Sequence, residues 1–330
     1  MNVAQQVEVL DLRHFSARQL RPLLEAEARV WEERLRWNYR SATELLLDYL
    51  DSRVLPGFVA TDRGRVCGFA FCVYEGQKSV IGDVYSVADG GRAADEITRL
   101  LLKHLLELLD HSPTVRRVES QLLLYESGTL SGVFRDAGFL VFPRLFLECE
   151  LEEPGGPAVV AEEFPAGLEL GRWAGSDYQV AAELIHRSYA GHIDASINDQ
   201  YRSLAGSLRF LHNIVRFPGC GVFEAQHSWV LRESATGRLG GLVLCSRIAE
   251  DVAHVTQLCV APAFRGRRLG EKLLRHAMEH LGRAGYAAVT LTVTEENRRA
   301  VALYEDLGFG VRHRFDSMYL EKDAAFRATA

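Results

Sequence analysis

A repeat constrains what this chain can fold into. Residues 133–139 read VFRDAGF and residues 303–309 read LYEDLGF, an offset of 170 positions in a chain of 330. Before each segment comes the same order of patterns: helical stretches, several apolar strands, a long amphipathic helix and one more strand. A repeated order of this kind predicts two tandem copies of one α/β domain rather than one large domain.

A segment rich in proline, glycine and glutamate, residues 151–166, separates the copies and has no periodicity that could bury a face. We therefore expect a first domain over 1–150, a linker over 151–166 and a second domain over 167–330. In the first copy the patterns predict strands at 8–12, 57–62, 65–74, 80–87, 116–124 and 139–150, and helices from 16, at 41–51, 94–110 and 129–137. In the second they predict strands at 168–172, 227–233, 239–249, 252–261 and 287–293, helices at 176–190, 198–216, 268–284 and 297–307, and a terminal strand pair.

Charge and composition exclude several classes of function. Lys and Arg total 38 against 44 Asp and Glu, a net charge of −6, whereas gripping nucleic acid needs a basic face. Residues 1–166 hold 18 basic and 26 acidic side chains, and residues 167–330 hold 20 and 18, so a polyanionic ligand fits the second half better. No secretory signal, no apolar run of about 18 residues and no CxxC pair occurs. We expect a cytoplasmic protein without a membrane, nucleic-acid or metal partner.

The stretch at 257–270, QLCVAPAFRGRRLG, carries the clearest chemistry. An apolar strand runs into a loop dense in arginine and glycine, and the loop opens a helix. The first turn of a helix presents unpaired N–H groups and the positive end of its dipole, which suits phosphate. Gly266 and Gly270 allow close approach, and Arg265, Arg267 and Arg268 supply charge. The alternative is a plain helix start with solvated arginines.

Together with NRRAVALYEDLGF at 297–309, this loop resembles the GCN5-related N-acetyltransferase (GNAT) superfamily. That family has Arg/Gln-x-x-Gly-x-Gly/Ala after its fourth strand and Asn-x-x-Ala-x-x-Leu-Tyr-x-x-x-Gly-Phe on a later helix. The match is close over 252–320, and the element order extends it over 167–322. Arg268 departs from the pattern, because it stands at the central glycine position. We expect it to be right-handed and to add a phosphate contact.

The resemblance implies two GNAT-like domains, each a mixed, mostly antiparallel twisted sheet flanked by helices. It implies acetyl-CoA as co-substrate, no metal, and transfer to a primary amine by direct attack in the second domain. Tyr304 would protonate the leaving thiolate, because a phenol keeps its proton at neutral pH. The implied residues for the acyl-CoA are Leu258, Cys259, Val260, Arg265, Gly266, Arg267, Arg268, Leu269, Gly270 and Asn297.

The general base and the acceptor site depend on fewer signals. His254 falls where many relatives carry a glutamate, and on regular alternation it shares a strand face with Thr256, Leu258 and Val260. The alternative is a strand histidine bonded to a neighbour. The helix junction at 189–201 is dense in hydrogen-bonding side chains, of which His192, Asp194, Asp199 and Tyr201 could orient an amine. Helix capping is the alternative there.

The first copy lacks the arginine–glycine loop, and Phe134 stands where the second copy has Tyr304. We expect it to be a degenerate scaffold. The tandem arrangement with one competent copy also resembles mycothiol synthase, whose acceptor is a cysteinyl amine. Two alternatives stay open: a non-catalytic CoA-binding sensor or scaffold, and a protein or peptide N-acetyltransferase. The acceptor is a small-molecule or peptide amine, and the chain a monomer or homodimer.

Overall fold

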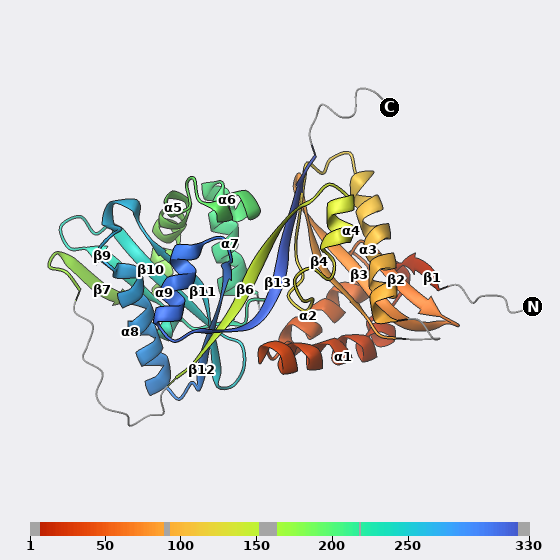
Figure 1. Ribbon diagram of the computed structural model, residues 1–330, viewed down its shortest axis with the longest axis horizontal. Helices are drawn as coiled ribbons and strands as arrows, with labels where there is room; N and C mark the ends of the chain where they lie inside the picture. Colours follow the sequence, from red (N-terminus) through yellow and green to blue (C-terminus); the bar gives the residue numbers. More distant parts are fainter. Residues whose placement is uncertain (1–6, 89–92, 152–163, 218, 323–330) are drawn as a thin grey trace, which may run out of the picture. The chain divides into compact units, whose positions relative to one another are not determined.

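The computed structural model describes residues 7–88, 93–151, 164–217 and 219–322. Within these, the chain divides into two compact units (Figure 1). Unit 1 comprises residues up to 33, 40–144 and 314 onward, and unit 2 comprises 34–39 and 145–313. Most of the predicted linker, residues 152–163, lies outside the described residues.

Unit 1 contains a sheet in the order β1-β2-β3-β4-β5-β13-β6. Its neighbours are antiparallel from β1 to β4, parallel between β4 and β5, and antiparallel between β5 and β13. The elements of the first half are β1 (Glu8–Asp11), α1 (Ala17–Leu35), α2 (Arg40–Asp51), β2 (Gly57–Asp62), β3 (Arg65–Glu75), β4 (Lys78–Ser86), α3 (Ala94–Asp110), β5 (Arg117–Gln121), α4 (Ser131–Asp136) and β6 (Leu140–Glu150).

Unit 2 contains a sheet in the order β13-β6-β12-β11-β10-β9-β7, with β8 also paired to β10. The β11–β12 pair has a parallel register, whereas those of β7–β9, β9–β10 and β10–β11 are antiparallel. The elements of the second half are β7 (Leu168–Arg172), α5 (Tyr178–Ser188), α6 (Ile193–Ile197), α7 (Leu204–Arg216), β8 (Val222–Phe223), β9 (Trp229–Glu233), β10 (Leu239–Arg247), β11 (Val252–Val260), α8 (Leu269–Arg283), β12 (Ala288–Thr294), α9 (Arg298–Asp306) and β13 (Gly310–Glu321). The prediction of one helix over 198–216 is wrong, because a 3-10 turn at Asp199–Tyr201 precedes α7.

The closing strands are exchanged between the two halves of the chain. The end of β13 pairs with β5 in unit 1, from Ser317 opposite Gln121 to Glu321 opposite Arg117, while β6 lies beside β12 in unit 2. The predicted terminal strand pair is therefore wrong: the chain does not turn back after residue 310 but continues as one strand. The predicted domains, 1–150 and 167–330, have other boundaries than the two units, because each unit includes a strand from the other half of the chain.

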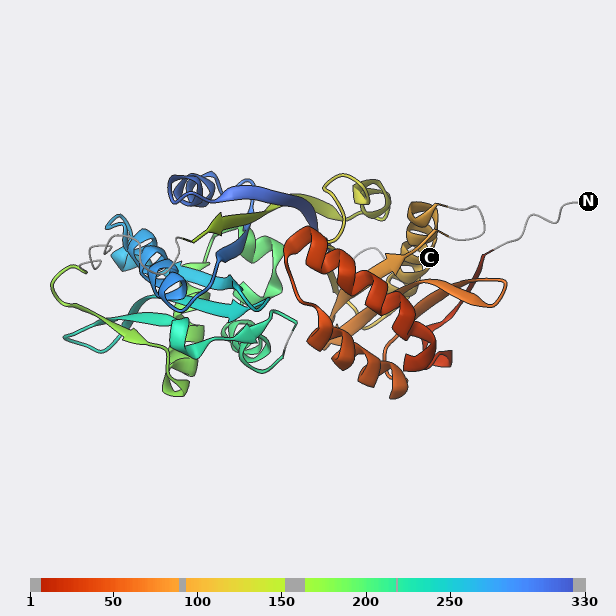
Figure 2. The same ribbon diagram turned by 90° about the horizontal axis from the view of Figure 1, so that it is seen from below.

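Alternating side chains give the unit 2 sheet two apolar faces. One face of α8, with Leu269, Leu273, Ala277 and Leu281 buried at helical spacing, packs on side chains such as Val243. Residues next to these in sequence, such as Leu242 and Leu244, face the other way and pack with α5 and α7. Figure 2 shows α8 and α5 on opposite sides of this sheet. The mixed sheet is thus covered by helices on both faces.

Each unit has a parallel pair of strands, β4–β5 in unit 1 and β11–β12 in unit 2, and the first strand of each pair contains a β-bulge. In β11 the register against β10 slips so that Thr256 has no partner, and in β4 Gly82 is skipped in the same way. Parallel pairing then covers only Val252–Val255 with Ala288–Leu291 in unit 2, and Lys78–Ile81 with Arg117–Ser120 in unit 1. Past each bulge the two strands part, because a bulge bends its strand and interrupts the ladder.

Unit 1 buries two carboxyl groups against each other. Glu27 on α1 is 1% exposed and shares a hydrogen bond with Asp83, the residue after the Gly82 bulge. Burial and the neighbouring carboxyl raise the pKa of Glu27 well above its usual range, and burial raises the pKa of Asp83 to about 6. Charging both groups in this apolar setting is unfavourable, so the pair holds a proton at neutral pH.

We predict that the stability of unit 1 falls as pH rises. A carboxyl whose pKa is higher in the folded than in the unfolded chain stabilises the fold while protonated, and this is lost from about pH 4 upward, through the folded pKa values. Glu27→Gln should be more stable than the wild type at pH 8 and flatten the dependence of the unfolding free energy between pH 5 and 8. Urea unfolding at several pH values measures this. Glu25→Gln, on an exposed face of α1, is the control, and wild-type and Glu27→Gln curves that run parallel would contradict the assignment.

Candidate functional site

The bulge at Thr256 reverses the direction of every later side chain on β11. Leu258 and Val260 pack on the α8 face, together with Ala253 and Val255, whereas Cys259 packs on the α5 face. The prediction that His254 shares a face with Leu258 and Val260 is therefore wrong. One inserted residue shifts the two-residue alternation of a strand, and no local pattern in the sequence marks it.

His254 lies in the interior of unit 2. It is 6% exposed, and its ring stacks on Phe146 and contacts Trp37, with centroids 5.7 and 5.2 Å away. Its Nδ1 lies 2.8 Å from the hydroxyl of Thr290 on β12. A base at this position would need a relay to reach an amine, so its catalytic role stays a prediction.

Gln257, the first residue past the bulge, joins β11 to the α5–α6 junction. Its amide donates to the Tyr189 hydroxyl at 3.0 Å and accepts from the Tyr201 hydroxyl at 3.2 Å. The two phenol rings stack with centroids 3.9 Å apart. Burial raises the pKa of Tyr189 well above its ordinary value, so the hydroxyl stays neutral. Gln257 was not predicted to have a role, although a polar amide within an otherwise apolar strand is visible in the sequence.

A second set of contacts joins the same junction to β12. The buried Asp194 accepts a 2.5 Å hydrogen bond from Thr294, at the end of β12. His192 begins α6: its Nδ1 lies 3.2 Å from the Asp194 backbone N and 3.4 Å from Asp194 Oδ2. The His192 Nε2 lies 3.4 Å from the side-chain nitrogen of Asn297, whose oxygen caps α9 by accepting from Ala300 N–H.

These contacts bring together three of the four residues predicted for the acceptor. His192 and Asp194 touch each other, and Tyr201 reaches β11 through Gln257. The fourth, Asp199, points to a different partner, since its carboxylate forms an ion pair with Arg209 at 3.3 Å. The structure also shows capping by His192, so the functional and the capping interpretation of this residue are compatible.

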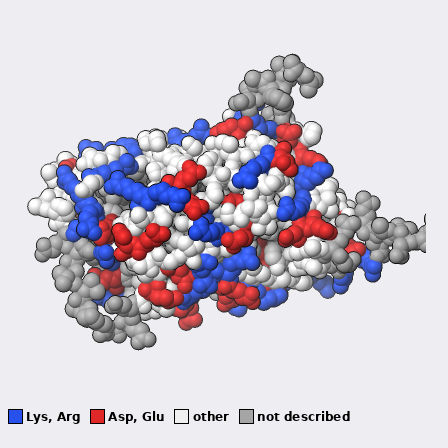
Figure 3. Space-filling view, viewed as in Figure 1, with Lys and Arg blue, Asp and Glu red and all other residues white. Residues whose placement is uncertain are grey.

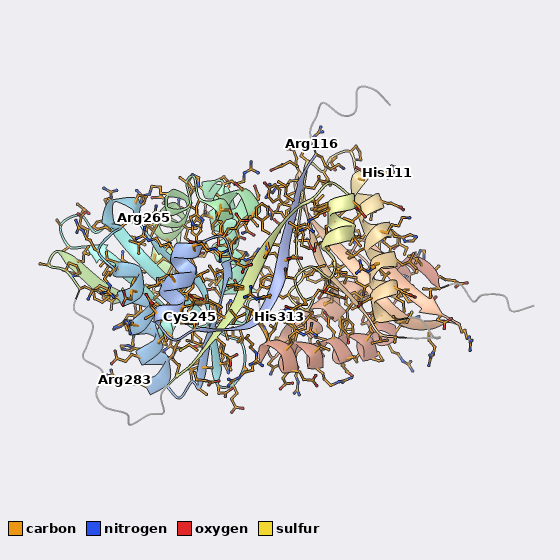
Figure 4. All side chains as sticks on the ribbon, viewed as in Figure 1. His111, Arg116, Cys245, Arg265, Arg283 and His313 are labelled. Atoms are coloured by element: carbon orange, nitrogen blue, oxygen red, sulfur yellow. The ribbon has the colours of Figure 1, made fainter. Side chains whose placement is uncertain are left out.

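The loop after β11 leads into the N-terminus of α8. Arg265 anchors it, because its guanidinium donates to the Ser188 carbonyl of α5 at 2.5 Å. Figure 4 labels Arg265 there, and Figure 3, in the same view, shows Lys and Arg side chains gathered over this part of unit 2. Leu269 is buried under the helix, while residues 265–268 are exposed. The N–H groups of residues 269–271 precede the first α8 bond, from Lys272 to Arg268.

Arg268 has a left-handed backbone, with φ 54° and ψ 22°. The expectation of a right-handed conformation is wrong, because the turn into α8 needs the geometry that glycine adopts without strain. Its guanidinium forms an ion pair with Glu271, at 2.7 Å, on the first turn of α8.

Tyr304, the residue predicted to protonate the thiolate, lies close to the end of α9. It is partly buried, with its ring 5.9 Å from that of Phe309. Cys220, before β8, is a poor nucleophile, because burial raises the pKa of its thiol to about 11 and so disfavours a thiolate. Among the described residues, no cluster of three His, Cys, Asp or Glu side chains could hold a metal ion. No helix in the described part of the chain is long and apolar enough to cross a membrane.

In unit 1 the corresponding place is filled. The Tyr125 hydroxyl donates to the carbonyl of Val84, beyond the Gly82 bulge, at 3.0 Å, and lies 3.2 Å from the Thr98 hydroxyl. Phe134 is fully buried, with its ring against Phe139. Asp95 and Glu96 occupy the first turn of α3, and part of the loop before it, residues 89–92, lies outside the described residues.

Comparison with known proteins gives this geometry a family. Residues 190–309 match the model of the acetyltransferase (GNAT) family. The chain contains a GNAT acetyltransferase domain. The fold of this chain is similar to that of a GCN5-related N-acetyltransferase from Sphaerobacter thermophilus, with a TM-score of 0.66, 16% identity, and 96% of this chain and 95% of that one covered. It is also similar to a tandem GNAT protein from the clavulanic acid biosynthesis pathway, with a TM-score of 0.58, 17% identity and 96% and 99% covered.

Two curated relatives match part of this chain in sequence. An alanine N-acetyltransferase of ribosomal protein bS18 from Salmonella typhimurium is 34% identical over 79 residues, 24% of this chain and 53% of the relative. A mycothiol acetyltransferase from Thermomonospora curvata is 39% identical over 103 residues, 31% and 32% of the two chains. The matched stretches thus span about half and about a third of these relatives.

We predict that Arg268→Val is less stable than Arg268→Gly by about 1 kcal/mol or more. Both variants lose the contact with Glu271, so their difference isolates the left-handed backbone, which a β-branched residue adopts at the greatest cost. Urea unfolding of the two proteins measures it. Equal midpoints and slopes would show that the turn relaxes to a conformation open to any residue.

Proposed function

We propose that this chain is an acetyl-CoA-dependent N-acetyltransferase whose reaction takes place in unit 2. The observation that carries the proposal is the divergence of β11 and β12 beyond the Thr256 bulge. Past Val255, the edge of β11 that faces β12 has no strand partner in the described structure, so the backbone of residues 258–260 can bind an extended, amide-bearing chain. The pantetheine arm of CoA is such a chain.

The phosphates of CoA fit the other end of the same path. Directly after β11, the loop at 265–268 and the first turn of α8 present N–H groups and arginines. The N-terminus of α8, a helix of 15 residues, with cations beside it favours the binding of a polyanion. Asn297, at the start of α9, lies on the β12 side of the divergence, where it can contact the arm.

The chemistry is a direct transfer. The lone pair of a neutral amine attacks the thioester carbonyl carbon, and the carbon–sulfur bond then breaks as the amide forms. The amine nitrogen gives up a proton to a base, and the thiolate takes one, for which Tyr304 is the proposed donor. This assigns Tyr304 the role of general acid; His254, which the sequence suggests as the base, would act on the amine through a relay.

Unit 1 lacks these features. The Tyr125 hydroxyl donates to the backbone where the CoA arm would lie, and two carboxylates occupy the first turn of α3. Phe134 stands in place of Tyr304, the proposed general acid. We therefore assign one acetyl-CoA site per chain. The acceptor is a primary amine, in keeping with the N-acetyltransferase named among the relatives; whether a small molecule or a peptide supplies it is left to an amine screen.

We predict that calorimetric titration with acetyl-CoA finds one site, which Gly270→Glu weakens about tenfold or more by placing an anion beside the phosphates. A Cβ at residue 270 would meet only Val260, at 3.8 Å, and an acid in the first turn suits the α8 dipole, so the variant should fold. Gly270→Ala, which adds no charge, should bind like the wild type. Absence of binding by the wild type would refute the enzyme, and a second site would refute the assignment of unit 1.

We predict that Tyr304→Phe lowers kcat by about 10²–10⁴, because the thiolate then leaves without a proton donor. Affinity for acetyl-CoA, measured by calorimetry, should change little. A protein that binds acetyl-CoA but turns over none of the amines, before or after this substitution, is instead a CoA-responsive sensor. A variant as active as the wild type would remove Tyr304 from the mechanism.

A further inference from the structure

His192 lies over the point where β11 and β12 part. On one side its ring packs edge-on against Tyr189, 5.3 Å between centroids, and Tyr189 is bonded to Gln257 of β11. On the other side it contacts Asn297, and its neighbour Asp194 is bonded to Thr294 of β12. The side chain is 32% exposed, in contrast to the enclosed ring of His254.

We infer that His192 is the general base of this site, with Asp194 as the residue that positions it. The inference deepens the proposed acetyl transfer and rests on it. The amine attacks the thioester carbon, its proton passes to Nε2 of the imidazole as the new C–N bond forms, and the C–S electron pair leaves with the thiolate. The imidazolium later returns the proton to water.

The contacts of the ring fit this role. Asn297 directs its NH₂ group at Nε2, since its oxygen is bonded to Ala300 N–H, and this requires a lone pair at Nε2. Asp194 Oδ2, 3.4 Å from Nδ1, can accept from an Nδ1–H. The Asp194 N–H, at 3.2 Å from Nδ1, favours the opposite tautomer. Binding of the CoA arm to Asn297 leaves Nε2 open to the amine, and the charged ring, with hydrogens on both nitrogens, is stabilised by the Asp194 carboxylate.

The charge near the ring has a defined origin. Among the described residues, the titratable side chains in contact with His192 include Asp194 on α6 and Tyr189 directly after α5, while Asn297 at the start of α9 is uncharged. Because burial raises the pKa of Tyr189, the phenol is neutral at the pH of an assay, and the Asp194 carboxylate is the charge that acts on the imidazole. Asp194 in turn is held by the Thr294 hydroxyl, so its orientation follows the end of β12.

The kinetic test uses thiol release from acetyl-CoA with Ala-Gly-Gly and S-methylcysteine amide as probe amines. His192→Gln should lower kcat/KM by about 10²–10³ and abolish the limb of the pH profile that imidazole titration produces, with acetyl-CoA affinity unchanged by calorimetry. Asp194→Asn should lower kcat and leave the KM for acetyl-CoA unchanged, because the variant loses the carboxylate that positions the ring but keeps the shape of the side chain. His212→Gln, an exposed histidine on α7, is the matched control.

A result that would overturn the inference is a His192→Gln enzyme with the wild-type profile, above all if His254→Gln loses the limb instead. If the wild type binds no acetyl-CoA, the proposed function fails first. If it binds but acetylates neither probe, ¹⁵N spectra of the histidine rings decide, with the His192 signals assigned by their loss in His192→Gln. Addition of acetyl-CoA should leave the neutral ring with its hydrogen on Nδ1; a hydrogen on Nε2, or signals that acetyl-CoA does not move, would refute the base.

Discussion

The site depends on one interruption of hydrogen bonding. At Thr256 the ladder between β10 and β11 slips by a residue, and the parallel ladder between β11 and β12 ends at Val255 and Leu291. Because the slip reverses the strand's alternation, Gln257 points to the α5–α6 junction and Leu258 to α8. The divergent strands then need other partners, which the junction supplies: Tyr189 and Tyr201 for β11, and Asp194 for β12. A regular strand here would close the gap.

The two units share one architecture but differ in the residues at the place where the strands part. Each has the bulge, the short parallel ladder and a long helix on one face of the sheet. In unit 1 the space is taken by interactions that hold the fold together: the proton-sharing pair of Glu27 and Asp83, and the Tyr125 hydroxyl on the Val84 carbonyl. The site proposed for unit 2 therefore depends on a few side chains and exposed backbone groups whose counterparts in unit 1 are occupied.

The sequence predicts most elements, because burying one face of a strand or helix imposes a period that single residues cannot hide. The Arg265–Gly270 loop and Asn297 were predicted from glycine, arginine and asparagine at fixed spacing, and their role in binding stays a prediction. The wrong predictions have a common origin: they concern features that leave no periodic pattern in the nearby sequence. One extra residue at Thr256 changes the face of His254 relative to Leu258, the turn sets the φ of Arg268, and the partner of β13 is chosen by a ladder nearly 200 residues away.

The exchange of β6 and β13 affects how the protein is made. The first half leaves the ribosome with the edge of β5 uncovered, and its partner, residues 317–321, is synthesised only after residues 145–313 of unit 2. Until then unit 1 carries an open edge of the kind that invites pairing with other chains. Unit 2 in turn holds a strand encoded before it. Neither half of the gene can be deleted without removing a strand from the other unit's sheet, so the two copies must be kept together.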